Sequence, residues 1–241
     1  MTRTTKQERA YQKRRLEKWD ERARAKSARN RRAALIGGVV LAIAVLITVI
    51  AMILGDADDE AASAPDAGSE ADVPDPAGAE GRAWQATIHT SVGDIAVDLD
   101  GAAAPQATAN FLALAEDGYY DATDCHRLLP TSLLQCGDPT GTGTGGPGYG
   151  FGPIENAPDD DLYPAGTLAM ARQGNNAESM GSQFFLVFAD VPLPADAAGG
   201  YSVFGHVTEG LEILQQVGEA GTVDGSEQPA QSVTIEGVTI E

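Results

Sequence analysis

The chain has 241 residues, and its formal net charge of −19 is divided unevenly along the sequence. Thirteen of the sixteen Lys and Arg residues lie in residues 1–34, and only Arg82, Arg127 and Arg172 follow them. Because the phosphates of nucleic acids must be met by cations, this composition argues against nucleic acid as a partner of the acidic remainder.

The N-terminal part of the chain is predicted to anchor it in the lipid bilayer. Residues 35–54 contain no charge and a single hydroxyl, that of Thr48, and about 20 apolar residues cross the hydrocarbon core as a helix. The long basic leader and the full-length apolar run favour an uncleaved anchor over a signal peptide. Since cationic flanks stay in the cytoplasm, we expect a basic cytoplasmic segment at 1–34. The transmembrane helix at 35–54 then makes a single-pass cell-membrane protein with an extracytoplasmic C-terminal domain.

Residues 55–83 have the composition of a tether. Ala, Asp, Glu, Pro, Gly and Ser dominate, and large apolar residues are almost missing. Such a segment cannot bury enough apolar surface to offset its chain entropy. We therefore expect a disordered acidic linker at 55–83 and a folded domain at 84–241.

Short β-strands dominate the prediction for the folded domain. Alternating apolar and polar residues indicate strands at 86–89 and 95–99, with a turn at 91–94 between them. Further strand-like runs follow at 123–128, 133–136, 168–171, 184–188, 203–208 and 232–240. Many short strands between Gly- and Pro-rich loops are typical of a closed antiparallel barrel.

Two short helices interrupt these strands. Residues 105–116 begin with Pro105 and stop shortly before Gly118, which is the usual asymmetry of helix ends. A second helix fits residues 211–217. The expected fold class is therefore mainly β with two helices.

Arg127 is the residue of this domain that most demands an explanation. It is one of only two cations after residue 83, among 22 acidic residues, and it lies within a predicted strand beside Leu128 and Leu129. An Arg in apolar surroundings needs partners. Either it forms an ordinary ion pair with one of the many acids, or it has a functional role.

Several motifs then converge on one family. Five segments carry the signal: 126–128 (HRL), 135–138 (QCGD), 143–146 (GTGG), 181–185 (GSQFF) and 203–207 (VFGHV). Their order and spacing resemble those of cyclophilins. The resemblance covers nearly all of residues 84–241. It implies an eight-stranded antiparallel barrel, capped by two helices, with a substrate groove on its outer surface.

The resemblance also implies roles for individual residues. Arg127 would be the catalytic residue, Gln135 would orient it, and Gln183 would bind the backbone of the substrate. Phe185 would form the floor of a proline pocket. The remaining substrate-binding positions would be Leu133, Leu193, Tyr201, Ala171 and Arg172. Neither a metal ion nor a cofactor is needed for this chemistry.

Two positions depart from the family pattern. Ser132 stands where relatives usually carry a Phe that lines the pocket, and the turn around it is expected to shift the strand register. Leu193 stands where many relatives carry Trp or another large apolar residue. We therefore expect only weak binding of cyclosporin-like ligands.

The implied activity is peptidyl-prolyl cis-trans isomerisation, in which an arginine assists rotation of X-Pro amide bonds. Proline-containing segments of unfolded or exported proteins would be the partners. The alternative is a module that binds proline peptides as a chaperone or scaffold with negligible turnover, and the altered position Ser132 supports it.

The two cysteines, Cys125 and Cys136, lie on strands that are expected to be neighbours. Outside the cytoplasm a disulfide between them is chemically allowed. Neighbouring Cβ atoms across a strand pair are usually somewhat too far apart for a disulfide. A disulfide and two buried thiols therefore both remain open at this point.

Overall fold

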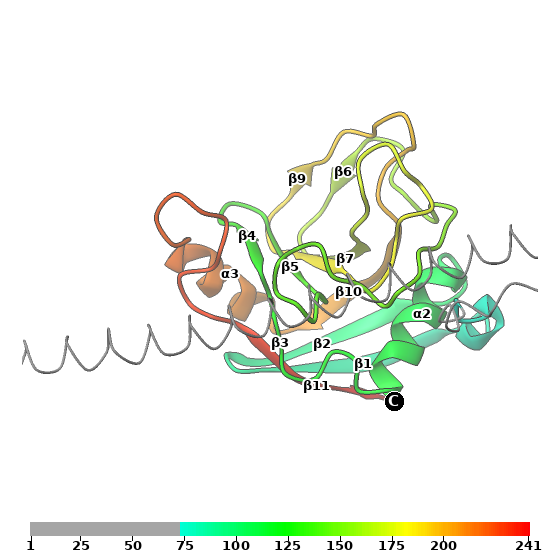
Figure 1. Ribbon diagram of the computed structural model, residues 1–241, viewed down its shortest axis with the longest axis horizontal. Coiled ribbons are helices and arrows are strands. Elements are labelled where there is room, and N and C mark those ends of the chain that lie inside the picture. Colours follow the sequence, from blue (N-terminus) through cyan, green and yellow to red (C-terminus); the bar gives the residue numbers. More distant parts are fainter. Residues whose placement is uncertain (1–72) are drawn as a thin grey trace, which may run out of the picture. The chain divides into compact units, whose positions relative to one another are not determined.

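The computed structural model describes residues 73–241 (Figure 1). The predicted segments 1–34 and 35–54 lie outside the described residues, as does the linker up to residue 72. Within residues 73–241, no helix has both the length and the apolar character needed to cross a membrane.

Antiparallel strands form the framework of this unit, with nine strands in one sheet and two in a separate pair. They are β1 (Ala83–Thr90), β2 (Gly93–Asp100), β3 (Thr123–Asp124), β4 (Arg127–Leu129), β5 (Leu133–Cys136), β6 (Leu162–Tyr163), β7 (Thr167–Met170), β8 (Phe184–Val187), β9 (Val191–Pro192), β10 (Val203–Glu209) and β11 (Thr234–Ile240). Every predicted strand has a counterpart, except that the predicted run at 123–128 is divided between β3 and β4.

The two edge strands of the large sheet are consecutive in the sequence, so the chain itself connects the two edges. The order of the sheet is β3-β11-β1-β2-β10-β7-β8-β5-β4, so β3 and β4 are its two edges. Only Cys125 and His126 separate these edges along the sequence. The stretch 123–129 therefore pairs with β11 at one end and with β5 at the other. Counted as one strand, β3 and β4 reduce the nine strands to the eight that the family resemblance implied.

Two α-helices accompany the sheet and lie on opposite sides of it in Figure 1: α2 (Pro105–Glu116) and α3 (Leu211–Ala220). The bounds of α2 are those predicted, and α3 extends three residues beyond its predicted end. The first turn of α2 has amide groups without partners inside the helix. Those of Gln106 and Ala107 donate to the carboxylate of Glu155, at 3.0 and 2.9 Å. A distant loop therefore caps this helix.

Aromatic side chains fill the interior of the barrel. The ring centroid of Phe111 on α2 lies 5.2 Å from that of Tyr120 and 5.5 Å from those of Phe184 and Phe204. All four side chains are buried. Aromatic rings at these separations contribute both buried apolar area and favourable ring–ring geometry. The core therefore ties α2 to β8 and β10.

Successive side chains of β8 point to opposite faces of the sheet, as strand geometry requires. Phe184 belongs to the core inside the barrel, whereas Phe185 belongs to a second apolar cluster. Leu133, Tyr163 and Val187 are further buried members of that second cluster. It supplies an apolar floor on the outer side of β5 and β8.

The folded region begins earlier than the predicted boundary at residue 84. A short 3-10 helix, η1 (Pro76–Ala79), precedes β1, and the Asp75 side chain accepts a hydrogen bond from its first turn. The indole N–H of Trp84 donates to the carbonyl of Ala79 at 2.9 Å. Residues 76–83 thus belong to the folded body rather than to the linker predicted at 55–83. A single turn of small residues has no periodic pattern, so the composition could not reveal it.

The sequence pattern also missed the two-residue strands β6 and β9. They pair with each other, Leu162 opposite Pro192 and Tyr163 opposite Val191. Strands this short show no alternation of apolar and polar residues. In Figure 1 they lie on the side of the molecule away from β1 and β2.

Candidate active site

Three neighbouring strands bring the predicted catalytic and pocket residues into one row. Arg127 on β4 is opposite Gln135 on β5, and Gln135 is in turn opposite Phe185 on β8. Residues directly opposite one another in antiparallel strands project from the same face. Because Phe184 faces the core, the row faces outward.

A chain of hydrogen bonds runs from Arg127 across this face. Its Nη1 donates to Oε1 of Gln135 at 3.3 Å, and Nε2 of Gln135 donates to Oε1 of Gln183 at 2.8 Å. Nε2 of Gln183 donates to the carbonyls of Gly143 and Gly145, at 3.1 and 2.9 Å. Gln135 therefore has the contact expected of an orienting residue. The predicted contact of Gln183 with a substrate backbone would require its amide to exchange these partners.

Asp138 holds the glycine-rich loop that borders this network. Its buried carboxylate accepts the backbone amides of Thr140, Thr142, Gly143 and Gly145 at 2.6–3.2 Å. Burial alone would raise the pKa of Asp138, but the Thr140 hydroxyl and the amides of Gly145, Thr140 and Gly143 lower it to about 2. A Cβ atom at Gly145 would clash with that carboxylate, so this position requires glycine.

An apolar cavity of about 180 Å³ lies on this face, with Arg127 among the residues that line it. It is lined by Arg127, Leu129, Leu133, Gln135, Ala171, Arg172, Phe185, Leu193 and Tyr201. The rings of Phe185 and Tyr201 meet edge to face, with centroids 5.4 Å apart. Eight of the nine predicted site residues therefore surround one cavity, and Gln183 is the exception.

The turn between β4 and β5 does not behave as its sequence suggested. Ser132 is buried, and its carbonyl accepts the amide of Phe188 at 2.7 Å, so it is not part of the cavity lining. The two strands that flank the turn pair regularly, with Leu129 opposite Leu133. Leu129, which the sequence did not single out, forms part of the wall.

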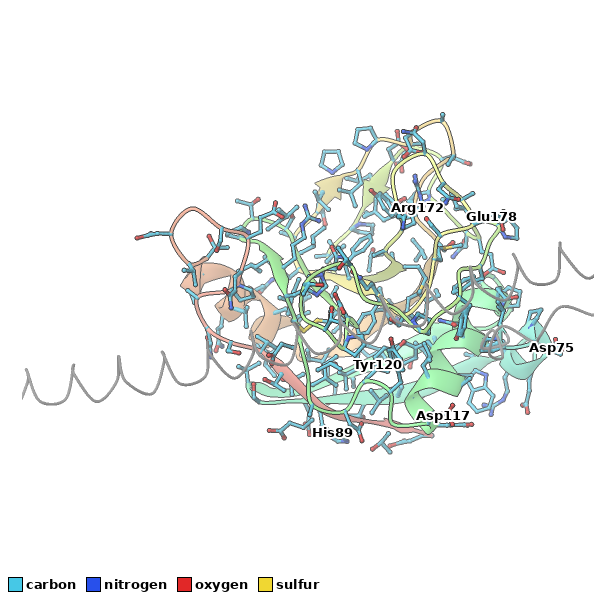
Figure 2. All side chains as sticks on the ribbon, viewed as in Figure 1. Asp75, His89, Asp117, Tyr120, Arg172 and Glu178 are labelled. Atoms are coloured by element: carbon cyan, nitrogen blue, oxygen red, sulfur yellow. A yellow bond between two sulfur atoms is a disulfide. The ribbon has the colours of Figure 1, made fainter. Side chains whose placement is uncertain are left out.

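Arg172 borders the cavity, but its guanidinium N–H groups donate to other groups of the protein. Its side chain is 1% exposed and pairs with Asp196 at 2.9 Å, and it also donates to the carbonyls of Gly199 and Gly200. The hydrogen bond from Arg172 holds the pKa of Asp196 well below its ordinary value. The guanidinium lies 4.9 Å from the ring centroid of Tyr201, and Figure 2 labels Arg172 on the side that carries β6. Arg172 therefore fastens a cavity wall.

A second cavity of about 280 Å³ adjoins the first. The two share Gln135, Ala171 and Arg172, and the second also contains Gln183 and the glycine-rich loop. The two cavities together form a groove along the outer face of β5 and β7. Gln183 lies in the part of this groove beyond the apolar cavity.

Glu227 is the contact of Arg127 that sequence analysis missed. It lies in the loop between α3 and β11, and its carboxylate accepts Nε of Arg127 at 2.6 Å and Nη2 at 3.3 Å. The hydrogen bond from Arg127 lowers the pKa of Glu227. The sequence indicated only that Arg127 could pair with an acid. With 22 acidic residues in the domain, nothing in the spacing selected this one.

The structure also answers the question that the cysteines left open. Cys125 and Cys136 form a disulfide, with their Cα atoms 4.0 Å apart. Cys125 lies between β3 and β4, two residues before Arg127, and Cys136 ends β5 directly after Gln135. The bond therefore joins the segment just before β4 to the end of β5, close to the Arg127–Gln135 contact.

Comparisons with known proteins point to one family. A family model described as cyclophilin type peptidyl-prolyl cis-trans isomerase/CLD matches residues 85–240. A probable peptidyl-prolyl cis-trans isomerase B of Mycobacterium leprae is 40% identical over 172 residues, covering 65% of this chain and 56% of the relative. A peptidyl-prolyl cis-trans isomerase of Helicobacter pylori is 39% identical over 141 residues, covering 58% and 83%. The chain thus spans about half the length of the mycobacterial relative.

Solved structures show the same likeness. A cyclophilin type isomerase of Cryptosporidium parvum is similar with a TM-score of 0.58 and 32% identity, covering 66% of this chain and 98% of the other. A second structure of that protein, obtained in the presence of the dipeptide Ala-Pro, has a TM-score of 0.57, 33% identity and coverages of 65% and 98%. Since the family model spans well over half of its residues, the chain belongs to the cyclophilin type peptidyl-prolyl cis-trans isomerase family.

Proposed function

We propose that this chain is a peptidyl-prolyl cis-trans isomerase in which Arg127 assists rotation of the X-Pro amide. The observation that carries the proposal is the apolar cavity that both Arg127 and Phe185 line. A proline ring fits an apolar floor of this kind. The fixed cation beside it is the group that the reaction needs.

The chemistry follows from the electronic structure of the amide. Resonance holds the bond planar, with a rotation barrier of about 18–20 kcal/mol. As the bond twists, the lone pair of the nitrogen localises and becomes able to accept a hydrogen bond. A guanidinium is always charged and donates from a rigid fork, so Arg127 favours the twisted amide over either planar form. Interactions made only in the transition state are those that accelerate a reaction.

The other site residues have supporting roles in this mechanism. Phe185, Leu133, Leu193 and Tyr201 hold the proline ring while the acyl side rotates, and they line the same cavity. Gln135 holds Arg127 through its hydrogen bond at 3.3 Å. The dipeptide present in the structure of the Cryptosporidium relative, Ala-Pro, supports proline peptides as the substrate class here.

The substrates that we propose are prolyl segments of exported proteins. The uncharged run 35–54 and the cations before it support a single-pass anchor with the isomerase domain outside the cytoplasm. The disulfide between Cys125 and Cys136 adds support, because such bonds persist in oxidising compartments. Cyclosporin-like ligands should bind weakly, since Leu193 offers less apolar surface than an indole.

The alternative, a groove that binds proline peptides without turnover, rested on Ser132. Its support is weaker now, because Ser132 is turned away from the cavity and Leu129 supplies the apolar wall. Catalysis and binding differ in a measurable way. A binding module would retain peptide affinity and show no exchange between the cis and trans isomers.

The test is isomerisation of a short X-Pro peptide by the purified full chain, followed by NMR exchange without a coupled protease. Arg127→Ala should lower kcat/KM on the order of 100-fold, as loss of one transition-state donor commonly does. Arg82→Ala is the matched control, since Arg82 pairs with Glu80 outside the groove. Wild-type activity in Arg127→Ala would defeat this mechanism. An inactive wild type that still binds the peptide would favour the binding module.

A further inference from the structure

The loop between α3 and β11 is built to present one carboxylate to Arg127. Within it, the amide of Val223 donates to the carbonyl of Gln228 at 2.9 Å, and that of Ser226 donates to the carbonyl of Val223 at 3.0 Å. The amide of Leu128 donates to the carbonyl of Glu227 at 2.6 Å. The loop is therefore fastened to β4 at the residue directly after Arg127.

The guanidinium of Arg127 is held from two sides. The carboxylate of Glu227 accepts Nε and Nη2, while Oε1 of Gln135 accepts Nη1. A guanidinium is planar, so contacts on both sides fix its plane as well as its position. One hydrogen on Nη1 and one on Nη2 then remain without a partner among residues 73–241. These hydrogens belong to a residue that lines the apolar cavity.

The pair contributes little to folding. The side chains of Arg127 and Glu227 are 38% and 57% exposed, and exposed ion pairs typically contribute about 0–1 kcal/mol to stability. Orientation is a different matter, because small misplacements of a catalytic group are costly to the rate. Since the contact with Arg127 lowers the pKa of Glu227, the carboxylate is ionised at neutral pH and accepts both hydrogen bonds.

We propose that Glu227 is a positioning residue, which fixes the plane of the Arg127 guanidinium so that its remaining N–H groups face the proline amide. This inference rests on the proposed function and adds a residue to it. Gln135 cannot supply the same constraint alone, because it contacts one terminal nitrogen at 3.3 Å. A carboxylate that spans Nε and Nη2 removes the remaining rotation.

The first test measures isomerisation of an X-Pro peptide by full-length variants. Glu227→Ala should lower kcat by about 10-fold, while peptide affinity stays near the wild-type value. Glu227→Gln should recover part of the loss, because its amide oxygen still accepts one hydrogen bond. Asp224→Ala is the matched control. Asp224 is an acid of the same loop, and its side chain makes no hydrogen bond or ion pair with any other residue among 73–241. This variant should keep wild-type activity.

Two further measurements separate positioning from a merely structural role. In Arg127→Ala, the additional change Glu227→Ala should lower the residual activity no further. NMR spectra of the Arg127 guanidinium should show slow rotation about the Nε–Cζ bond in the wild type and fast rotation in Glu227→Ala.

The outcomes distinguish this inference from the function beneath it. A wild-type chain without isomerase activity would overturn the proposed function. An active wild type with unchanged kcat in Glu227→Ala would overturn the positioning role alone. The positioning role would also be overturned if Glu227→Ala lowered the activity of Arg127→Ala by the same factor as it lowers that of the wild type.

Discussion

Arg127 and Arg172 both border the apolar cavity, but they differ in exposure and in hydrogen-bond partners, and therefore in role. The side chain of Arg127 is 38% exposed, and its ion-pair partner is a surface carboxylate. That of Arg172 is 1% exposed and is directed at Asp196 and nearby carbonyls. The always-charged guanidinium of Arg172 is therefore buried and paired within the protein, where its role is structural. The guanidinium of Arg127 is partly exposed and can still donate to a substrate.

Asp138 gives a residue-scale prediction for stability. Its pKa is lowered from 3.8 to about 2, so the unfolded chain binds its proton more readily than the folded one does. The charged form then stabilises the fold by about 2 kcal/mol above pH 4, and this contribution disappears as the pH falls toward 2.

The measurement is urea unfolding of residues 73–241 across that pH range. Asp138→Asn should be less stable than the wild type at pH 7, and the difference should shrink below pH 4. A difference that stays constant down to pH 2 would contradict the assigned cause, which is the ionised carboxylate.

At the scale of elements, the β4–β5 pair is the part of the barrel on which the site depends. It places Arg127 opposite Gln135, and β8 continues the row with Phe185. The disulfide between Cys125 and Cys136 links the segment just before β4 to the end of β5. The cross-link, the hydrogen bond and the strand pairing therefore constrain one short stretch of chain.

We predict that this cross-link stabilises the folded chain. The two cysteines are 11 residues apart in sequence, and closing a loop of this size contributes about 3 kcal/mol by restricting the unfolded chain. The double variant Cys125→Ala/Cys136→Ala should lose about that free energy of unfolding. The control is the same unfolding measurement in dithiothreitol. The reductant should lower the free energy of unfolding of the wild type and leave that of the variant unchanged. Equal stabilities without reductant would contradict the prediction.

At the scale of the whole molecule, charge divides the chain into a basic part and an acidic part. Thirteen cations precede the uncharged run at 35–54, and 31 acidic residues follow it. The proposed orientation, with the N-terminus in the cytoplasm, follows from this asymmetry. The enzymatic groove lies in the acidic part, where Arg127 and Arg172 are rare cations.

This orientation predicts the behaviour of the chain in intact cells. The full chain should sediment with membranes, and protease added from outside should digest the domain that contains Arg127. Deletion of 35–54 should move the chain out of the membrane fraction. Protection of the domain from external protease, despite membrane sedimentation, would reverse the proposed topology.

Local patterns predicted much of the fold. Pro105 and Gly118 mark the limits of α2 closely, because helix ends depend on residues next to them in sequence. The strands β2 and β5 were predicted because alternation and turn residues are also local signals. The strands β6 and β9 were missed, since each has two residues and exists only because the other lies beside it.

Sequence alone determined the division of the chain by charge, the mainly β class and, through its motifs, the residues that surround the cavity. Tertiary structure decided which acid pairs with Arg127, whether Cys125 meets Cys136, and that Leu129 rather than Ser132 lines the wall. The reason is physical. Propensity and periodicity act between residues close in sequence, whereas the partner at position 227 lies 100 residues from Arg127 and reaches it only when the barrel closes.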